Sequence, residues 1–253
     1  MCHKRLACQI KTGHKYYQMK HQKIIFLLVA VFAFLNSCSD TPKDMLVNVS
    51  VKGLKKGTLY LQKVEDSLIV NVDSISVNTE TPFTLEADIE SPELFYLFLD
   101  RKSTNPNDDR ILFFGEEGSI TLETSLENYF LGAKISGSVA HNILEEYQKM
   151  KKQFQNKRLE LFKAYFEAEK ANKKDTLPIL TAASQNLEKR QLLYTINYAV
   201  SNADSEVAPY LAITEFPAKA TSFLDTLQKS LSPKVKASKY GKMLEKYLSE
   251  NVD

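Results

Sequence analysis

The feature that most constrains the fold is a change in the spacing of apolar residues near Ser138. Before it, short runs alternate between apolar and polar residues, a period of two that is typical of half-buried β-strands. After it, apolar residues recur every three or four positions, which is typical of amphipathic helices. The sequence therefore predicts an α+β fold, with strands first and helices after, as one domain or as two packed subdomains.

About eight short runs are predicted as strands. Residues 46–61 are expected to form a β-hairpin around the turn-rich segment Gly53-Leu54-Lys55-Lys56-Gly57. Further runs are predicted as strands at 68–77, 83–87, 95–99, 111–114, 120–123 and 133–135. Their number and spacing predict an antiparallel β-sandwich or a small barrel, and we place this β-rich domain at residues 45–137.

The α-helical region is predicted over residues 138–253. Gly137 and Ser138 supply a break and a capping residue for a long helix that ends near Asn172. A second long helix is expected to begin at the cap candidate Asp175 and to run to about Asn202. Shorter helices are predicted at 206–215, 221–230 and 233–249.

The N-terminal 37 residues are predicted to be a signal peptide. Residues 24–35 are apolar without interruption and follow a basic segment. A run of this length is too short to span a bilayer, which needs about 20 residues, but it suits the core of a secretory signal. Counting from Met19 gives a leader of ordinary length, so Met19 is an alternative start to a long natural basic region from Met1.

The end of this leader, Leu35-Asn36-Ser37-Cys38, resembles the lipobox of bacterial lipoproteins. The resemblance implies cleavage between Ser37 and Cys38 and lipid attachment at the Cys38 sulfur; the alternative is a chance cysteine after an ordinary signal. Residues 38–44 would then be a lipidated tether to a membrane. By resemblance, Ser39 after the lipidated cysteine favours the outer membrane, with the periplasmic and the external face both open.

Charge and reactive residues exclude several functions. The leader holds six of the 33 basic residues and no acidic one, which leaves 27 basic against 31 acidic residues, so no nucleic-acid partner is predicted. Beyond residue 37 the chain has one cysteine, Cys38, and one histidine, His141. We expect His141 to be exposed and predict no catalytic residue, no metal ligand and no cofactor.

Two groups of oxygen-bearing side chains are weak candidates for a site. The first could ligate Ca²⁺, although a polar turn explains it better, and consists of Asn105, Asn107, Asp108 and Asp109. The second could supply a glycosidase carboxylate pair, although the rim of a hairpin explains it as well, and consists of Glu116, Glu117 and Glu123.

The first long helix carries aromatic and basic residues that allow two interpretations each. The aromatic side chains are expected to form a core stripe rather than a ligand slot and are Phe154, Phe162, Tyr165 and Phe166. The basic residues are expected to form a solvated face, with contact to anionic head groups as the alternative, and are Lys149, Lys151, Lys152, Lys157 and Arg158.

Several short segments of the sequence resemble segments of a known family. They are Gly53-Leu54 to Leu61, Ile135-Ser136-Gly137-Ser138 and Ser238-Lys239-Tyr240-Gly241-Lys242. With a lipoprotein leader, this order is similar to the N-terminal module, domain of unknown function 4369, and helical arm of thiol–disulfide oxidoreductase lipoproteins. Their redox motif, WCxxC, is missing here, so the resemblance implies the accessory module alone.

We therefore expect a non-enzymatic envelope lipoprotein that binds a protein or peptide partner. The alternative is an accessory subunit of an envelope thiol–disulfide system that acts with a separate thioredoxin-like protein.

Overall fold

The structure is a computed structural model that describes residues 43–78, 82–101, 109–216 and 221–251. The chain divides into two units, Met1–Pro42 and Lys43–Asp253, and the following description concerns the second unit.

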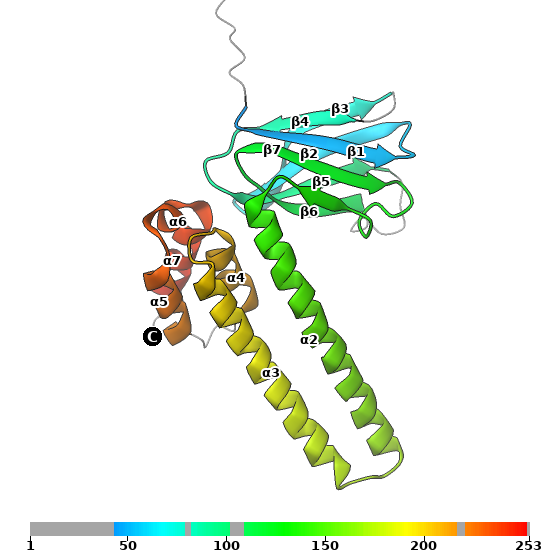
Figure 1. Ribbon diagram of the computed structural model, residues 1–253, viewed down its shortest axis with the longest axis vertical. Coiled ribbons are helices and arrows are strands. Elements are labelled where there is room, and N and C mark those ends of the chain that lie inside the picture. The colour runs from blue at the N-terminus through cyan, green and yellow to red at the C-terminus, as the bar shows by residue number, and fades with distance from the viewer. Residues whose placement is uncertain (1–42, 79–81, 102–108, 217–220, 252–253) are drawn as a thin grey trace, which may run out of the picture. The chain divides into compact units, whose positions relative to one another are not determined.

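The first part of this unit consists of two four-stranded sheets (Figure 1). One sheet has the order β4-β1-β7-β8 and the other has the order β3-β2-β5-β6. The strands within the described residues are β1 (Met45–Lys52), β2 (Gly57–Glu65), β3 (Leu68–Val77), β4 (Phe83–Ala87), β5 (Glu93–Asp100), β6 (Arg110–Gly115), β7 (Gly118–Ser125) and β8 (Lys134–Ser136). The predicted α+β fold with an N-terminal sandwich is confirmed, and the sheets do not close into a barrel.

Alternation along the strands builds the core between the two sheets. Met45, Val47 and Val49 of β1 are completely buried, and they pack in one cluster with Phe95 and Leu97 of β5 in the opposite sheet. Each such side chain contributes about 1.5–3 kcal/mol when it is fully buried. The period of two therefore identified the strands because one face of each strand points into this shared core.

The predicted hairpin over residues 46–61 is wrong. β1 and β2 lie in different sheets: β1 pairs with β4 and β7, whereas β2 pairs with β3 and β5. The turn after β1 carries the chain across the sandwich, and its Leu54 is buried in the core. β1 and β7 are also parallel, from Met45 opposite Gly118 to Lys52 opposite Ser125, which departs from a purely antiparallel sandwich.

Helices make up the rest of the unit. Those within the described residues are α2 (Val139–Lys170), α3 (Thr176–Ser201), α4 (Val207–Glu215), α5 (Thr221–Ser230), α6 (Pro233–Ala237) and α7 (Lys239–Asn251). The long helices α2 and α3 pack side by side as a hairpin, which we call the arm (Figure 1). The predicted cap of α2 is confirmed, since the Ser138 Oγ accepts a hydrogen bond from the His141 N–H at 2.9 Å. Asp175 precedes α3 but its side chain makes no capping hydrogen bond.

The single helix predicted over 233–249 is instead the two helices α6 and α7. Ser238 has extended backbone between them, and its Oγ accepts a hydrogen bond from the Gly241 N–H at 3.3 Å. The chain returns so closely that a Cβ on Gly241 would lie 2.0 Å from the Val235 carbonyl oxygen. The serine cap and the glycine therefore end one helix and start the next within a few residues.

A separate apolar cluster joins the helices to the sandwich. Phe114 of β6 packs against Leu144 of α2, Leu211 of α4 and Tyr240 of α7. The Tyr240 hydroxyl accepts a hydrogen bond from the Leu94 N–H of β5 at 3.2 Å. This cluster holds α7 beside the edge of the sandwich where β5 begins.

Candidate functional site

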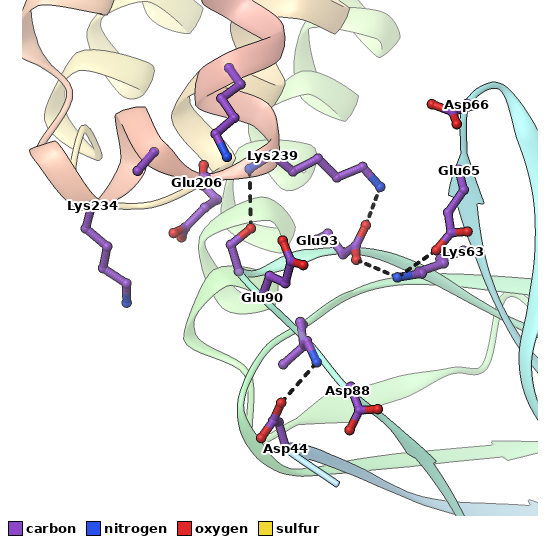
Figure 2. A pocket seen from close by; sticks show the side chains of 15 residues that line it. Asp44, Lys63, Glu65, Asp66, Asp88, Glu90, Glu93, Glu206, Lys234 and Lys239 are labelled. Atoms are coloured by element: carbon purple, nitrogen blue, oxygen red, sulfur yellow. Dashed lines mark hydrogen bonds and ion pairs between the residues drawn. The ribbon is translucent and has the colours of Figure 1, made fainter.

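A concave site lies where the sandwich meets α6 and α7 (Figure 2). It has a volume of about 810 Å³, within the usual range for ligand sites, and we call it the junction cleft. Its acidic side chains are Asp44, Glu65, Asp66, Asp88, Glu90, Glu93 and Glu206. Its basic side chains are Lys63, Lys234, Lys239 and Lys242. Seven acidic against four basic side chains leave the lining with an excess of three negative charges.

An ion-pair network fixes one wall of the junction cleft. Glu93, the first residue of β5, has a side chain that is 8% exposed and pairs with Lys63 of β2 at 3.4 Å. The other oxygen of Glu93 pairs with Lys239, the first residue of α7. Lys239 also donates to the carbonyl oxygen of Val64 at 2.8 Å, so it fastens α7 to two strands. Figure 2 shows Glu93 between the two lysines.

The network also keeps Lys63 charged. Burial alone lowers the pKa of this lysine, but hydrogen bonds and charge from Glu65 and Glu93 outweigh burial and raise the pKa above its usual value. Removal of Glu93 would leave Lys239 without a carboxylate partner and Lys63 paired with Glu65 alone, and breaking pairs in which one partner is buried is destabilising. The pairs therefore serve to hold the wall of the cleft in place.

Glu206 is the anomalous group in the junction cleft. It precedes α4, is 4% exposed, and its Oε1 has no hydrogen-bond partner among the described residues. Burial raises its pKa, while a hydrogen bond from its own backbone N–H and the positive charge of Lys234 act in the opposite direction. Figure 2 shows Glu206 and Lys234 beside each other at the cleft, with no hydrogen bond or ion pair between them. A buried acceptor without a partner is rare in folded proteins because it loses its hydrogen bonds to water.

The arrangement offers negative charge and hydrogen-bond acceptors to a cationic group. Within the residues that the structure describes, no three His, Cys, Asp or Glu side chains are grouped so that they could hold a metal ion. No helix in that part of the chain is long and apolar enough to cross a membrane.

The predicted lipid-attachment and cleavage residues, Cys38 and Ser37, lie outside the described residues. His141, which we expected to be exposed, is buried at 8% exposure. Its Nδ1 accepts a hydrogen bond from the Phe114 N–H at 3.4 Å, and burial lowers its pKa. The expectation failed because His141 lies one helical turn before Leu144, on the face of α2 that packs against β6.

The proposed Ca²⁺ group is divided between described and undescribed residues. Asp109 is 1% exposed, and its carboxylate pairs with the Arg101 Nε at 2.5 Å. Arg101 also donates to the Leu126 carbonyl oxygen at 2.8 Å, so Asp109 belongs to a structural ion pair. Asn105, Asn107 and Asp108 lie outside the described residues.

The three residues suggested as a glycosidase carboxylate pair have other positions in the structure. Both oxygens of Glu116 accept hydrogen bonds from the N-terminus of α2, at 2.5 Å from Val139 N–H and 3.2 Å from Ala140 N–H. Glu123 lies opposite Lys134 in the pairing of β7 with β8. Glu117 follows Glu116 in the turn before β7 and is exposed. Glu116 is thus a helix cap, where a carboxylate is favourable.

The core stripe predicted for the first long helix is wrong in the distal part of the arm. Phe154 packs against Tyr194 of α3, with ring centroids 5.9 Å apart. By contrast, Phe162 and Phe166 are 66% and 58% exposed, and Tyr165 is 37% exposed. There α2 has α3 on one side only, so a stripe wide enough for a core helix is left partly uncovered.

Most of the basic residues named on α2 are exposed to solvent, and one of them forms an ion pair with another helix. The side chains of Lys149 and Lys157 are 68% and 59% exposed, as expected for a solvated face. Lys152 and Arg158 are also exposed. Lys151 instead pairs with Glu215 of α4 at 2.6 Å.

Glu93, Glu206 and Lys239 were not predicted as site residues. Glu93 and Lys239 are 146 positions apart, and no local pattern marks two residues that meet only in the folded chain. Glu206 precedes the apolar residues that begin a predicted helix. This position indicates the end of a helix but does not indicate that the side chain is buried.

Residues 45–144 match the family model described as domain of unknown function (DUF4369). This segment holds all the strands described above and the start of α2, and it confirms the resemblance of the N-terminal module. No curated protein and no solved structure gives a significant match. The junction cleft combines side chains from this module, such as Glu93, with side chains from outside the match, such as Glu206 and Lys239.

Proposed function

We propose that this protein is a non-enzymatic, lipid-anchored envelope lipoprotein that binds a protein partner in the junction cleft. The observation that carries the proposal is the buried Glu206 carboxylate, whose Oε1 lacks a hydrogen-bond partner among the described residues. It belongs to an open cleft with an excess of negative charge. A bound partner would supply the donor that this acceptor lacks, which favours the bound state.

The membrane is the second partner in this proposal, through lipid on Cys38. The lipobox-like residues before Cys38 and the apolar leader support acylation. Two or three acyl chains hold a protein on a membrane durably, because each buried methylene contributes about 0.8 kcal/mol. Ser39 supports the outer membrane as its location, and the proposal covers the periplasmic and the external face.

Binding, rather than catalysis, is the role that the side chains of the junction cleft support. Within the cleft Glu93 is held by two lysines, and outside it the buried His141 uses its Nδ1 to accept a backbone hydrogen bond. We therefore assign no catalytic residue, no cofactor and no nucleic-acid partner.

The family match supports a second candidate function. The DUF4369 module resembles the N-terminal part of thiol–disulfide oxidoreductase lipoproteins, so the chain could act as an accessory subunit beside a separate thioredoxin-like protein. The two candidates differ in the identity of the partner.

Site-specific photo-crosslinking in the native envelope tests both candidates. A photoreactive residue replaces Lys242, which is exposed at the cleft, or Lys152, which is exposed on the arm as the matched control. We expect a protein adduct from position 242 that is absent from position 152, and mass spectrometry identifies it. A thioredoxin-like protein in the adduct would select the second candidate. Adducts from position 152 alone would overturn the assignment of the cleft.

A further inference from the structure

We infer that the junction cleft receives a lysine or arginine side chain of the partner, whose ammonium or guanidinium group binds the buried Glu206 carboxylate. This inference rests on the proposed function, and it specifies the chemistry of the bound segment.

The charge balance of the cleft favours a cation. Glu93, Lys63, Lys239 and Glu65 pair with one another, and Asp88 pairs with Lys43 at 2.6 Å. Among the remaining lining residues, four acidic and two basic side chains form no ion pair with the described residues, and these are Asp44, Asp66, Glu90, Glu206, Lys234 and Lys242. An excess of negative charge therefore remains after internal pairing, and it attracts positively charged groups.

Glu206 marks the place where the cation would bind. Its residue exposure is 4%, it lines the cleft, and its buried Oε1 has no hydrogen-bond partner among the described residues. A hydrogen bond between charged groups is about twice as strong as one between neutral groups. Lys234 of α6 forms no ion pair within 4.0 Å of the described carboxylates, and Figure 2 shows no interaction between it and Glu206.

The geometry favours an organic cation over a metal ion. Ca²⁺ requires six to eight oxygen ligands, and the described residues contain no group of three or more carboxylate, imidazole or thiolate side chains that could hold a metal. A lysine or arginine side chain needs one or two acceptors at its tip and apolar contact along its stem. Ile89 and Ala237 supply apolar surface in the lining. A free polyamine has the same ammonium chemistry, so it forms a separate arm of the experiment.

The experiment titrates the full acylated chain in detergent with short capped peptides. The cationic probe is acetyl-Lys-Gly-Lys-Gly-Lys-amide, and the matched anionic probe has Glu in place of each Lys. Spermidine and calcium chloride are the remaining probes. Calorimetry measures the dissociation constant for the wild type, Glu206→Gln, and the control Glu245→Gln, which removes an exposed carboxylate of α7 outside the cleft lining.

We expect the lysine peptide to bind the wild type and the Glu245→Gln control equally, and Glu206→Gln to weaken binding about 10- to 100-fold. We expect Lys234→Gln, an exposed change that removes a competing cation, to strengthen binding severalfold. Circular dichroism would show whether Glu206→Gln folds poorly. In that case the increase in affinity expected for Lys234→Gln still tests the inference.

Equal binding to the wild type and Glu206→Gln would overturn the inference, as would preference for the anionic peptide or for Ca²⁺. Binding of spermidine without binding of the peptide would overturn the assignment to a protein side chain. If crosslinking at position 242 persists while the cationic peptide fails to bind, the inference fails and the proposed function stands. Loss of the crosslink as well would reject both.

Discussion

Replacement of Tyr240 by phenylalanine tests how firmly the helices are held against the sandwich. Tyr240 of α7 is 7% exposed, and its hydroxyl accepts a hydrogen bond from the Leu94 N–H at 3.2 Å. Its ring packs at 5.8 Å from the ring of Phe114 and at 5.4 Å from the ring of Tyr210. Tyr240→Phe keeps these ring contacts and removes only the acceptor.

The expected cost follows from the backbone donor that remains. A buried N–H left without a partner costs about 1–3 kcal/mol, and because the Leu94–Tyr240 hydrogen bond is partly buried, Tyr240→Phe should lower the free energy of unfolding by about 1 kcal/mol, the lower end of this range. A destabilisation of 1 kcal/mol corresponds to a fall in melting temperature of about 2–4 °C in a protein of this size. Urea unfolding followed by circular dichroism measures the change, with the slope of the transition as a check on the denatured state.

Tyr165→Phe is the matched control, because Tyr165 is 37% exposed on the arm. Surface changes of this kind alter stability by less than about 0.5 kcal/mol. If Tyr240→Phe and Tyr165→Phe unfold at the same free energy as the wild type, the hydrogen bond to β5 does not contribute to holding α7. The reasoning that Tyr240 helps to hold α7 against β5 would then be refuted.

Three further predictions concern Glu206, Gly137 and Cys38. Burial raises the pKa of Glu206 in the folded protein above its ordinary value of 4.5. The contribution of this carboxyl to stability is therefore fully present below pH 4.5 and is lost as the pH rises through the folded pKa. Glu206→Gln should therefore melt at a higher temperature than the wild type at neutral pH, with a gain that vanishes below pH 4.5; an equal gain at both pH values would contradict the burial of an ionised carboxyl. Gly137→Ala places a Cβ 2.2 Å from the Ser119 carbonyl oxygen at a φ of +92°, whereas Gly118→Ala meets nothing within 4 Å at a φ of +114°. Both should lose about 1–3 kcal/mol of unfolding free energy to backbone strain, and Gly137→Ala should lose more; equal losses by chemical denaturation would contradict the close approach. Cys38→Ser should move the protein out of the detergent phase in a phase-partition assay, and unchanged partition would contradict lipid attachment.

The period of the apolar residues predicted most of the fold because each strand and helix buries one face. The alternation from Met45 to Val51 reflects a core between two sheets, and Ser138 caps α2 as its position before an apolar helix suggested. The assignment of β1 and β2 to different sheets could not be predicted. A turn signal shows that the chain changes direction, and the choice of strand partner depends on residues far away in the sequence.

The candidate site was harder to predict for the same reason. The junction cleft depends on the contact of Glu93 with Lys239 and on the burial of Glu206, and no spacing rule connects these positions. His141 is another residue whose long-range contacts could not be predicted from the sequence. Its place in the first turn of α2 was predictable, whereas the packing of that turn against β6 was not. The lipid-attachment prediction at Cys38 has a different basis, because it depends on a short contiguous motif.

Hydrogen–deuterium exchange of the anchored protein, alone and with its crosslink-identified partner, tests the central claim most directly. The account predicts that the partner protects amides in two segments that line the junction cleft, 88–93 and 234–242, and leaves the exposed part of the arm at 155–169 unchanged. Slower exchange in both cleft segments at once would support binding between the sandwich and α6–α7. Protection confined to 155–169, with the cleft segments exchanging as in the free protein, would contradict it.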